Sequence, residues 1–340
     1  MTGIPRSTAA PRREPFRLAQ IALALLGATL LALLIRRAGV AAIAETLARV
    51  RPGFLALDVL VVAVIFVALA MRWRLLARAL GCDARFGTFL GARLAGLSIG
   101  TLTPGAKLGG EPLRAYLLAR GGIAAGPAVA TVIVDRGVEL LANVVFALIY
   151  CALFAFRDAT AAARVLAVVV AAGAGLGFAV RFGVKRLASG RSLVPARFRP
   201  LLERLGAAER VLAETDHALR ELLFDHRRIV FATLGWALVT NAVIFADYLT
   251  IFAAFGPLPS LPDLAGSMLG VGLAHALPIP GSLGALEGAQ AAVFRLAGAP
   301  DMAIVAASVA RIRDVVWTIP GLVYLGLLAL GRRNNPRPET

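Results

Sequence analysis

Apolar runs about as long as a lipid bilayer is thick recur along the whole chain. A hydrocarbon core of about 30 Å takes roughly 20 helical residues to cross. Six runs are close to that length or longer: Phe16–Ile35, Phe54–Met71, Gly126–Phe156, Arg164–Phe182, Ile229–Phe255 and Asp301–Leu330. The composition, 59% hydrophobic and 16% charged, also argues against a water-soluble domain. We therefore predict an all-α integral membrane protein with six full spans.

A secretory signal peptide is the alternative for the first run, Phe16–Ile35. Its apolar stretch exceeds the roughly 7–15 residues of a signal-peptide core. Arg36 and Arg37 follow at the place where a cleavage site needs small residues. We therefore predict a membrane span.

Two further apolar segments, Phe86–Leu118 and Leu264–Leu296, are each interrupted by a Pro-Gly pair. The interrupting residues are Pro104 and Gly105 in the first segment, and Pro280 and Gly281 in the second. Each arm is too short for a full crossing. Proline removes a backbone donor, and irregular backbone at membrane depth is stable only inside protein or beside a wet cavity. We therefore predict two re-entrant helical hairpins, which makes eight hydrophobic segments in all.

The basic residues gather between alternate spans. The chain has 36 Lys+Arg against 20 Asp+Glu, a net charge of +16. Arginine-rich loops stay in the cytoplasm, and such loops are the N-terminal segment, Arg72–Arg85, the amphipathic connector 183–228 and the C-terminal tail. Gly256–Pro262, on the other side, carries no charge. The first external loop is the exception, with Arg36, Arg37, Arg49 and Arg51. We predict cytoplasmic N- and C-termini and, because loops account for the basic excess, no nucleic-acid partner.

The two halves of the chain repeat a pattern of charges. A shift of 176 positions places the first Pro-Gly break on the second, Glu111 on Glu287, and Arg136 between Arg311 and Arg313. The half-repeats 16–156 and 164–331 each hold three spans and one hairpin, so the second enters the membrane from the opposite side. Inverted repeats with broken helices are a recurring architecture of secondary transporters. The alternative is a duplicated helical bundle whose breaks merely relieve packing.

Ionisable residues also lie inside the membrane segments, where each costs roughly 2.5–3.5 kcal/mol on insertion scales and therefore faces the protein interior. We expect a substrate site between the repeats made by Lys107, Glu111, Arg114, Arg136, Glu287, Arg311, Arg313 and Asp314. Guanidinium binds phosphate in a bidentate manner, which suits a phospholipid or a lipid-linked pyrophosphate. The structural alternative is that Glu111–Arg136 and Glu287–Arg311 are buried ion pairs locking hairpin to span.

Three further polar residues receive a different interpretation. We expect Asp247 and His275 to be satisfied by local packing, while Arg93 either lines the cavity or snorkels.

Several chemistries leave no signature in the sequence. It has no Gly-x-x-x-x-Gly-Lys-Ser/Thr phosphate loop, no His/Cys cluster for zinc and no Gly-x-Ser-x-Gly nucleophile. We therefore expect no cofactor, no metal and no ATPase activity, and a transporter rather than an enzyme. Two alternatives stay open. One is an integral-membrane transferase with Glu111 or Glu287 as general base, and the other is a non-catalytic subunit that binds lipid-synthesis enzymes.

Two short segments resemble the signatures of the flippase-like membrane family, which includes the N-terminal membrane domain of lysylphosphatidylglycerol synthases. Residues 104–118 read PGAKLGGEPLRAYLL and are similar to the first signature, and residues 280–287 read PGSLGALE and are similar to the second. Asp135 and Arg136 match the acid/basic dipeptide of the following span. Ala106 departs from the pattern, since the family more often has a second glycine there.

This resemblance implies a bacterial inner-membrane protein that moves a lipid, such as an aminoacyl-phosphatidylglycerol, between leaflets. Relatives are also associated with lipid-linked glycans and hopanoids, so the substrate stays open. The sequence ends at Thr340 without an aminoacyl-transferase domain, and synthase activity is therefore not implied.

Overall fold

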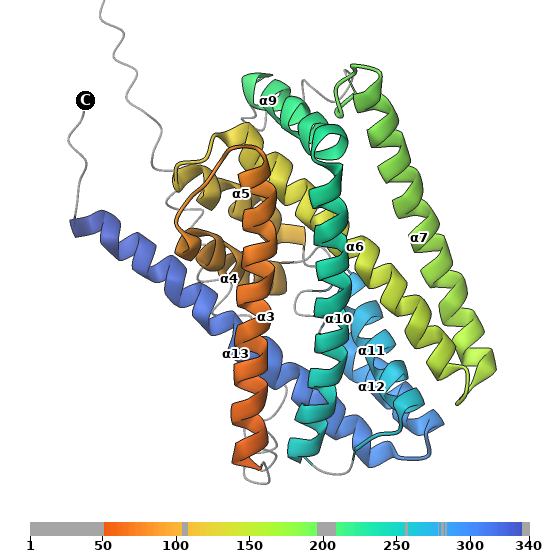
Figure 1. Ribbon diagram of the computed structural model, residues 1–340. Coiled ribbons are helices and arrows are strands. Elements are labelled where there is room, and N and C mark those ends of the chain that lie inside the picture. Colours follow the sequence, from red (N-terminus) through yellow and green to blue (C-terminus); the bar gives the residue numbers. More distant parts are fainter. Residues whose placement is uncertain are drawn as a thin grey trace, which may run out of the picture.

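The computed structural model describes residues 51–103, 108–195, 209–255, 258–277, 279, 282 and 284–334. These residues form helices and no strands (Figure 1). In chain order the helices are α3 (Pro52–Ala79), α4 (Phe86–Leu102), the 3₁₀ turn η1 (Leu108–Gly110), α5 (Glu111–Arg120), α6 (Ala125–Phe154), α7 (Ala159–Ala188), α9 (Glu209–Arg220), the π-turn η3 (Glu221–Asp225), α10 (Arg227–Phe255), α11 (Leu261–Ala276), α12 (Ala285–Leu296) and α13 (Pro300–Asn334). The all-helical prediction is confirmed for this part of the chain.

Five of these helices are long and apolar enough to cross a membrane: α3, α6, α7, α10 and α13. They overlap five of the six predicted spans, while the sixth, Phe16–Ile35, lies outside the described residues. Their outer faces carry large apolar side chains, such as Phe178 on α7, which is 71% exposed. A helix that is apolar on its outer as well as its inner face fits a lipid environment. The structure therefore supports a multi-pass membrane protein.

Both interrupted segments form two short helices that pack against each other, α4 with α5 and α11 with α12. The Pro-Gly pairs themselves lie outside the described residues. Close approach explains two glycines here, Gly96 of α4 and Gly110, which ends η1 just before α5. A Cβ atom at Gly110 would collide with the backbone carbonyl of Gly96, and a Cβ at Gly96 would lie 2.6 Å from Cγ of Arg114. Small residues let helices approach closely in lipid.

Helix bounds in the two halves follow one offset. A shift of 176 positions carries α3 to 228–255, α4 to 262–278, α5 to 287–296 and α6 to 301–330. Helices α10, α11, α12 and α13 begin and end within four residues of those ranges. Packing follows the same correspondence, because α4 lies against α13 and α11 lies against α6.

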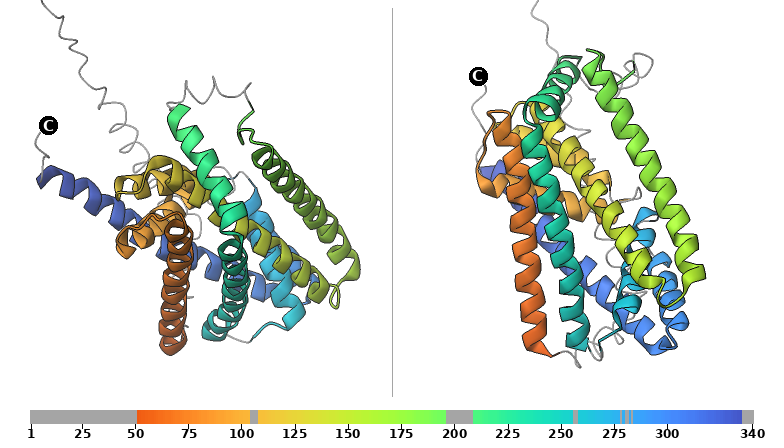
Figure 2. Two further views of the ribbon diagram at one scale, coloured as in Figure 1. Left: turned by 45° about the horizontal axis from the view of Figure 1, so that its top comes forward. Right: turned by 45° about the vertical axis from the view of Figure 1, so that its right-hand side comes forward.

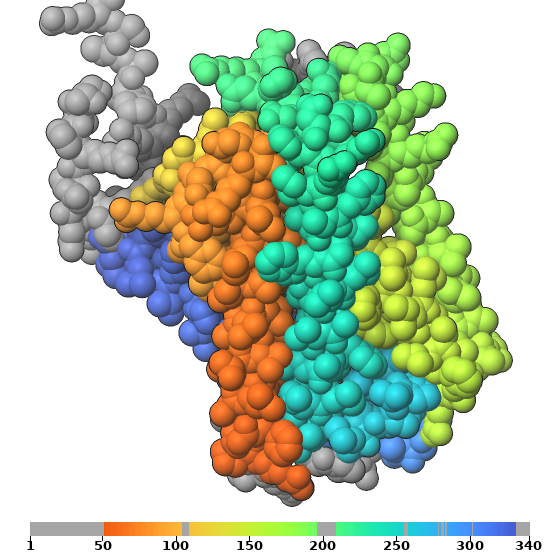
Figure 3. Space-filling model, viewed as in Figure 1, coloured from red at the N-terminus to blue at the C-terminus, as the bar shows by residue number. Residues whose placement is uncertain are grey.

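Helices α3 and α10 lie side by side and run in opposite directions (Figures 1 and 3). The backbone N–H of Arg51 donates to the carbonyl of Ala254 at 3.1 Å, which joins the start of α3 to the end of α10. The α4–α5 and α11–α12 pairs lie toward opposite ends of the bundle (Figures 1 and 2). The strongly tilted helices α6 and α13 connect these ends.

The connector between α7 and α10 is described only in part, since residues 196–208 are outside the described ranges. Its helix α9 buries an apolar face, including Leu219, against Leu76, Val134 and Leu187. The hydroxyl of Thr215 donates to the carbonyl of Gly126 at 3.3 Å. This part of the predicted amphipathic connector is therefore packed onto one end of the bundle.

Candidate functional site

Asp135, in the first half of α6, is the centre of one group of buried charges. Its carboxylate is fully buried and accepts hydrogen bonds from arginines on three different helices. Arg72 of α3 donates from Nε and Nη2 to Oδ1, at 3.0 and 2.7 Å. Arg93 of α4 and Arg114 of α5 donate to Oδ2, at 2.7 and 2.6 Å. One carboxylate thus ties α3, α4 and α5 to α6.

Two glutamates add negative charge at the edge of this group. Glu111, the first residue of α5, accepts a 2.8 Å hydrogen bond from Nη1 of Arg114. Glu139 accepts one of 3.1 Å from Nη2 of Arg93. Both glutamates are about one-fifth exposed. The guanidinium of Arg114 also lies 4.3 Å from the centre of the Trp73 ring, a cation–π contact.

Arg136 is held differently from its three neighbours. Its Nε lies 3.7 Å from Glu111 and its Nη1 lies 3.5 Å from Glu139. Both distances are too long for strong hydrogen bonds. Nε is buried and has no hydrogen-bond partner among the described residues, although the side chain as a whole is 19% exposed. Arg136 is therefore a partly accessible cation with hydrogen-bonding capacity to spare.

We call this group the first charge cluster: Arg72, Arg93, Glu111, Arg114, Asp135, Arg136 and Glu139. Its four guanidinium groups face three carboxylates, so the ionised cluster has a net charge of +1 in the described part of the chain. A net positive charge in a poorly hydrated interior favours binding of an anion.

A second group of charges surrounds one turn of α13. Arg311 donates from Nε and Nη2 to the two oxygens of Glu287, at 2.7 and 2.9 Å, and from Nη2 to the carbonyl of Ser282 at 2.9 Å. Glu287 in turn accepts from the backbone N–H of Gly284, whose φ of +79° suits glycine. This bidentate ion pair fastens α12 to α13.

Arg313, two positions further along α13, turns toward α3 and α10. Its Nη2 lies 2.6 Å from Asp247 and its Nη1 lies 3.6 Å from Asp58. Next on the helix, Asp314 lies 3.5 Å from Nε2 of His275. We call this group the second charge cluster: Asp58, Asp247, His275, Glu287, Arg311, Arg313 and Asp314.

The residues predicted as one site fall into these two clusters. Glu111, Arg114 and Arg136 lie in the first cluster, and Glu287, Arg311, Arg313 and Asp314 lie in the second. Lys107 lies outside the described residues, as do Pro104, Gly105, Pro280 and Gly281. His275 contacts Asp314, which agrees with a polar residue satisfied by its surroundings.

The predicted site did not include Asp135 or Glu139, and sequence reasoning also missed Arg72 and Asp58. Arg72 was assigned to a cytoplasmic loop because it opens an arginine-rich segment, yet it is 1% exposed and bound to Asp135. Asp58 was passed over, although it is the one acid within the apolar run Phe54–Met71. A charge inside such a run is itself the signal that would have found it.

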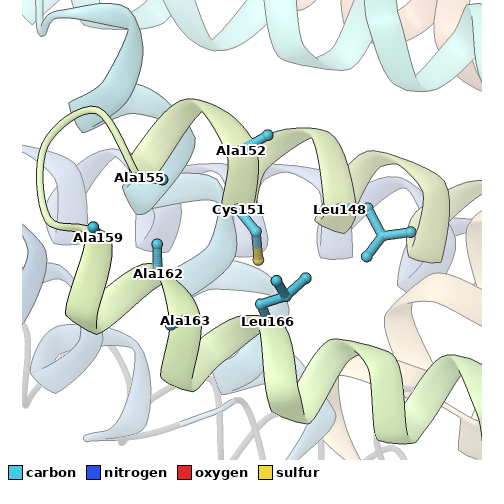
Figure 4. Close-up of a pocket in the computed structure, with 8 residues that line it drawn as sticks. All are labelled: Leu148, Cys151, Ala152, Ala155, Ala159, Ala162, Ala163 and Leu166. Atoms are coloured by element: carbon cyan, nitrogen blue, oxygen red, sulfur yellow. The ribbon is translucent and has the colours of Figure 1, made fainter.

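An apolar groove of about 400 Å³ lies between α6 and α7 near the turn that joins them (Figure 4). It is lined by Leu148, Cys151, Ala152, Ala155, Ala159, Ala162, Ala163 and Leu166. Leu148 is about 18 Å along α6 from Arg136 at 1.5 Å per residue. The groove is therefore separate from the first charge cluster, and its lining suits a hydrocarbon chain.

Comparison with known proteins covers nearly the whole chain. The family model described as lysylphosphatidylglycerol synthase TM region matches residues 18–321. A UPF0104 membrane protein of Methanothermobacter thermautotrophicus is 29% identical over 316 residues, which cover 88% of this chain and 92% of the relative. A UPF0104 membrane protein of Pyrococcus horikoshii is 24% identical over 332 residues, covering 92% of this chain and 96% of the relative. No catalytic domain is evident in the matched region.

Proposed function

The chain belongs to the lysylphosphatidylglycerol synthase TM region family, and from that premise we propose that it moves a lipid between the leaflets of a membrane, as a flippase or scramblase does. The substrate is an anionic or aminoacylated phospholipid, or another lipid-linked phosphate. The single observation that carries the proposal is Arg136, a partly exposed guanidinium whose Nε has no hydrogen-bond partner among the described residues, in a cluster of net positive charge.

A phosphate headgroup would complete the first charge cluster. Two parallel N–H···O bonds from one guanidinium fit a phosphate. Arg136 makes only long contacts to Glu111 and Glu139, so it exchanges them for a bound phosphate at little cost. Arg72, Arg93 and Arg114 already bind Asp135 at 2.6–3.0 Å and serve as the fixed frame.

The architecture favours alternating exposure of this headgroup site. In the proposed arrangement the halves 16–156 and 164–331 are inverted repeats, and α4–α5 and α11–α12 are hairpins that enter from opposite sides. The common offset of the helix bounds, the reciprocal packing of α4 on α13 and α11 on α6, and the antiparallel pair α3 and α10 support it. Rocking of one repeat against the other is the usual motion of such folds.

We also propose that the N- and C-termini and the connector face the cytoplasm. Helix α9, the C-terminal end of α13 and the loop after α3 lie toward the same end of the bundle (Figure 1), and that loop is rich in arginine. A cytoplasmic, that is inner, membrane of a bacterium is the proposed location on the strength of the sequence resemblance. The two relatives described above are archaeal.

A transferase mechanism is less well supported. It needs a glutamate that acts as a general base without an arginine partner. Glu111 is bound by Arg114, and Glu287 is bound by Arg311. The pairing of both glutamates therefore favours transport over group transfer.

Reconstitution tests the proposal. Purified protein is placed in liposomes that contain a phospholipid labelled on its anionic headgroup, and leaflet exchange is followed by quenching with an impermeant reagent. We expect Arg136→Gln to slow exchange at least tenfold, about 1.4 kcal/mol, because the variant loses the positive charge and the paired N–H donors of the guanidinium. Arg136→Lys keeps the charge but not the bidentate geometry and is expected between the two.

Arg210→Gln is the matched control, since Arg210 on α9 is 88% exposed and pairs with Glu214 on the same helix. Its exchange rate is expected to equal that of the wild type. Wild-type protein without exchange activity contradicts the function. Wild-type exchange by Arg136→Gln contradicts the headgroup site alone.

A further inference from the structure

Two buried carboxyl groups lie together outside the proposed headgroup site. Asp58 of α3 is 3% exposed and Asp247 of α10 is 1% exposed. Both face Arg313 of α13, which therefore joins helices of the two halves of the chain. We call Asp58 and Asp247 the carboxyl pair.

The guanidinium of Arg313 is not shared equally by the carboxyl pair. It lies 2.6 Å from Asp247 and 3.6 Å from Asp58, and it stacks over the Tyr248 ring at 4.7 Å. Both carboxyl groups thus lie against one guanidinium and close to each other. Oδ1 of Asp58 and Oδ2 of Asp247 are buried and have no hydrogen-bond partner among the described residues. Two neighbouring carboxyl groups satisfy each other by a hydrogen bond only when one of them holds a proton.

The charges around the carboxyl pair lead to the same result. One guanidinium neutralises one carboxylate, and Arg311, the other arginine on this turn, is bound to Glu287. Among the described residues, the other titratable side chains nearby are Tyr248, Tyr150 of α6, and Asp314 with its neighbour His275, and none of them is an arginine or a lysine. A second ionised carboxylate would therefore be an uncompensated charge inside the membrane region, which costs several kcal/mol.

We propose that Asp58 and Asp247 bind one exchangeable proton between them, which makes the junction of α3, α10 and α13 a proton-binding site. The proton cancels the excess negative charge and supplies the hydrogen of the carboxyl–carboxyl contact. Because the site joins the two halves, gain or loss of the proton changes the charge at the place where they would move against each other. The inference goes beyond the proposed function and stands whether or not the chain moves lipid.

Infrared spectroscopy of the full chain in vesicles tests this site, with the spectrum of each variant compared with that of the wild type. In sodium-free buffer at neutral pH, we expect the wild type to show the C=O stretch of a protonated carboxylic acid. Asp58→Asn and Asp247→Asn should each abolish that band, because the remaining carboxylate then has Arg313 to itself. Arg313→Gln should instead raise the band about twofold, since both carboxyl groups are protonated without the cation.

Asp83→Asn is the control, because Asp83 lies outside the membrane segments and pairs with Arg74 and Arg78; it should leave the band unchanged. Circular dichroism and gel filtration verify folding of each variant. A wild-type spectrum without the band overturns the proposal and needs no variant. A band that persists in both Asn variants, or that disappears when sodium replaces the buffer cation, also overturns it, the latter in favour of a metal cation.

Discussion

The two charge clusters occupy related positions, but corresponding residues of α6 and α13 within them carry opposite charges. Under the shift of 176 positions, Asp135 corresponds to Arg311 and Arg114 corresponds to Gln290. In the first half an arginine of the short helix α5 reaches an acid of α6, whereas in the second half an arginine of α13 reaches the acid Glu287 of α12. The corresponding positions of α6 and α13 thus carry opposite charges, while Glu111 and Glu287 at the corresponding positions of α5 and α12 carry the same one.

The surroundings of the two ion pairs differ as well. Around Asp135 the arginines outnumber the acids and the central carboxylate is fully buried. Around α13 the acids outnumber the arginines, and Glu287 is 45% exposed. An arginine-rich interior attracts an anion, while an acid-rich one attracts a proton. One helix arrangement therefore supports two different binding chemistries.

The largest expected effect comes from removing the central carboxylate of the first cluster. Asp135→Asn leaves Arg72, Arg93 and Arg114 buried without their common partner. Breaking a buried pair in this way costs about 3–5 kcal/mol, so we expect a large fall in the midpoint of thermal unfolding in detergent. Fluorescence-detected gel filtration after heating measures that midpoint.

Arg311→Gln is the matched change in the second cluster. The variant leaves Glu287 without its partner, but this carboxylate is partly open to water. Loss of an ion pair with so exposed a carboxylate lowers the free energy of unfolding by only about 1 kcal/mol. We expect its unfolding midpoint to lie much closer to that of the wild type than the midpoint of Asp135→Asn. Equal falls in the two midpoints would mean that the different burial of the two ion pairs does not affect stability.

Two glycines at corresponding positions sharpen the comparison at the level of packing. The shift places Gly96 of α4 on Gly272 of α11. A Cβ at Gly96 would lie 2.6 Å from Cγ of Arg114, whereas a Cβ at Gly272 would meet no atom of the described residues within 4 Å. We expect Gly96→Ala to destabilise the protein by about 1–3 kcal/mol, the usual cost of overpacking.

Gly272→Ala should be neutral or stabilising by about 0.5–1 kcal/mol, because alanine is the better helix former. Unfolding midpoints of both variants, measured side by side, check the pair. If Gly272→Ala destabilises the protein, or if Gly96→Ala does not, the α4–α5 contact is not packed more closely around its glycine than the α11–α12 contact.

The helices could be predicted from the sequence, but the contacts within the first charge cluster could not. The helices could be predicted because apolar length and Pro-Gly breaks are local signals, and the common offset repeats them. The convergence on Asp135 could not, because Arg72 is 63 positions away and contacts it only through the packing of α3 on α6. An arginine at the end of a span carries the same signal whether it faces cytoplasm or a buried acid. Hence Arg72 was placed in a loop.

The smallest expected effect concerns the loops, where the two halves again differ. Asp83, after α3, accepts hydrogen bonds from Arg74 at 2.8 and 2.9 Å and from Arg78. The shift carries Asp83 to Pro259, in a loop without charge. Hydrogen bonding by Arg74, assisted by Arg78, lowers the pKa of Asp83 to about 2. Because the folded-state pKa is depressed, the ion pair stabilises the fold above the ordinary carboxyl pKa, and the effect is lost as pH falls toward 2.

Asp83→Asn should therefore lower the unfolding midpoint slightly at neutral pH, because an ion pair exposed to water contributes little. The difference between wild type and variant should shrink as pH falls from about 4 toward the depressed pKa, where the wild-type carboxyl becomes protonated. Thermal unfolding across this range measures the difference. A difference between the two unfolding midpoints that widens on acidification would show that Asp83 is held by something other than its two arginines. The charged loop after α3 would then not be stabilised by its ion pairs, and in this respect it would not differ from the uncharged loop of the second half.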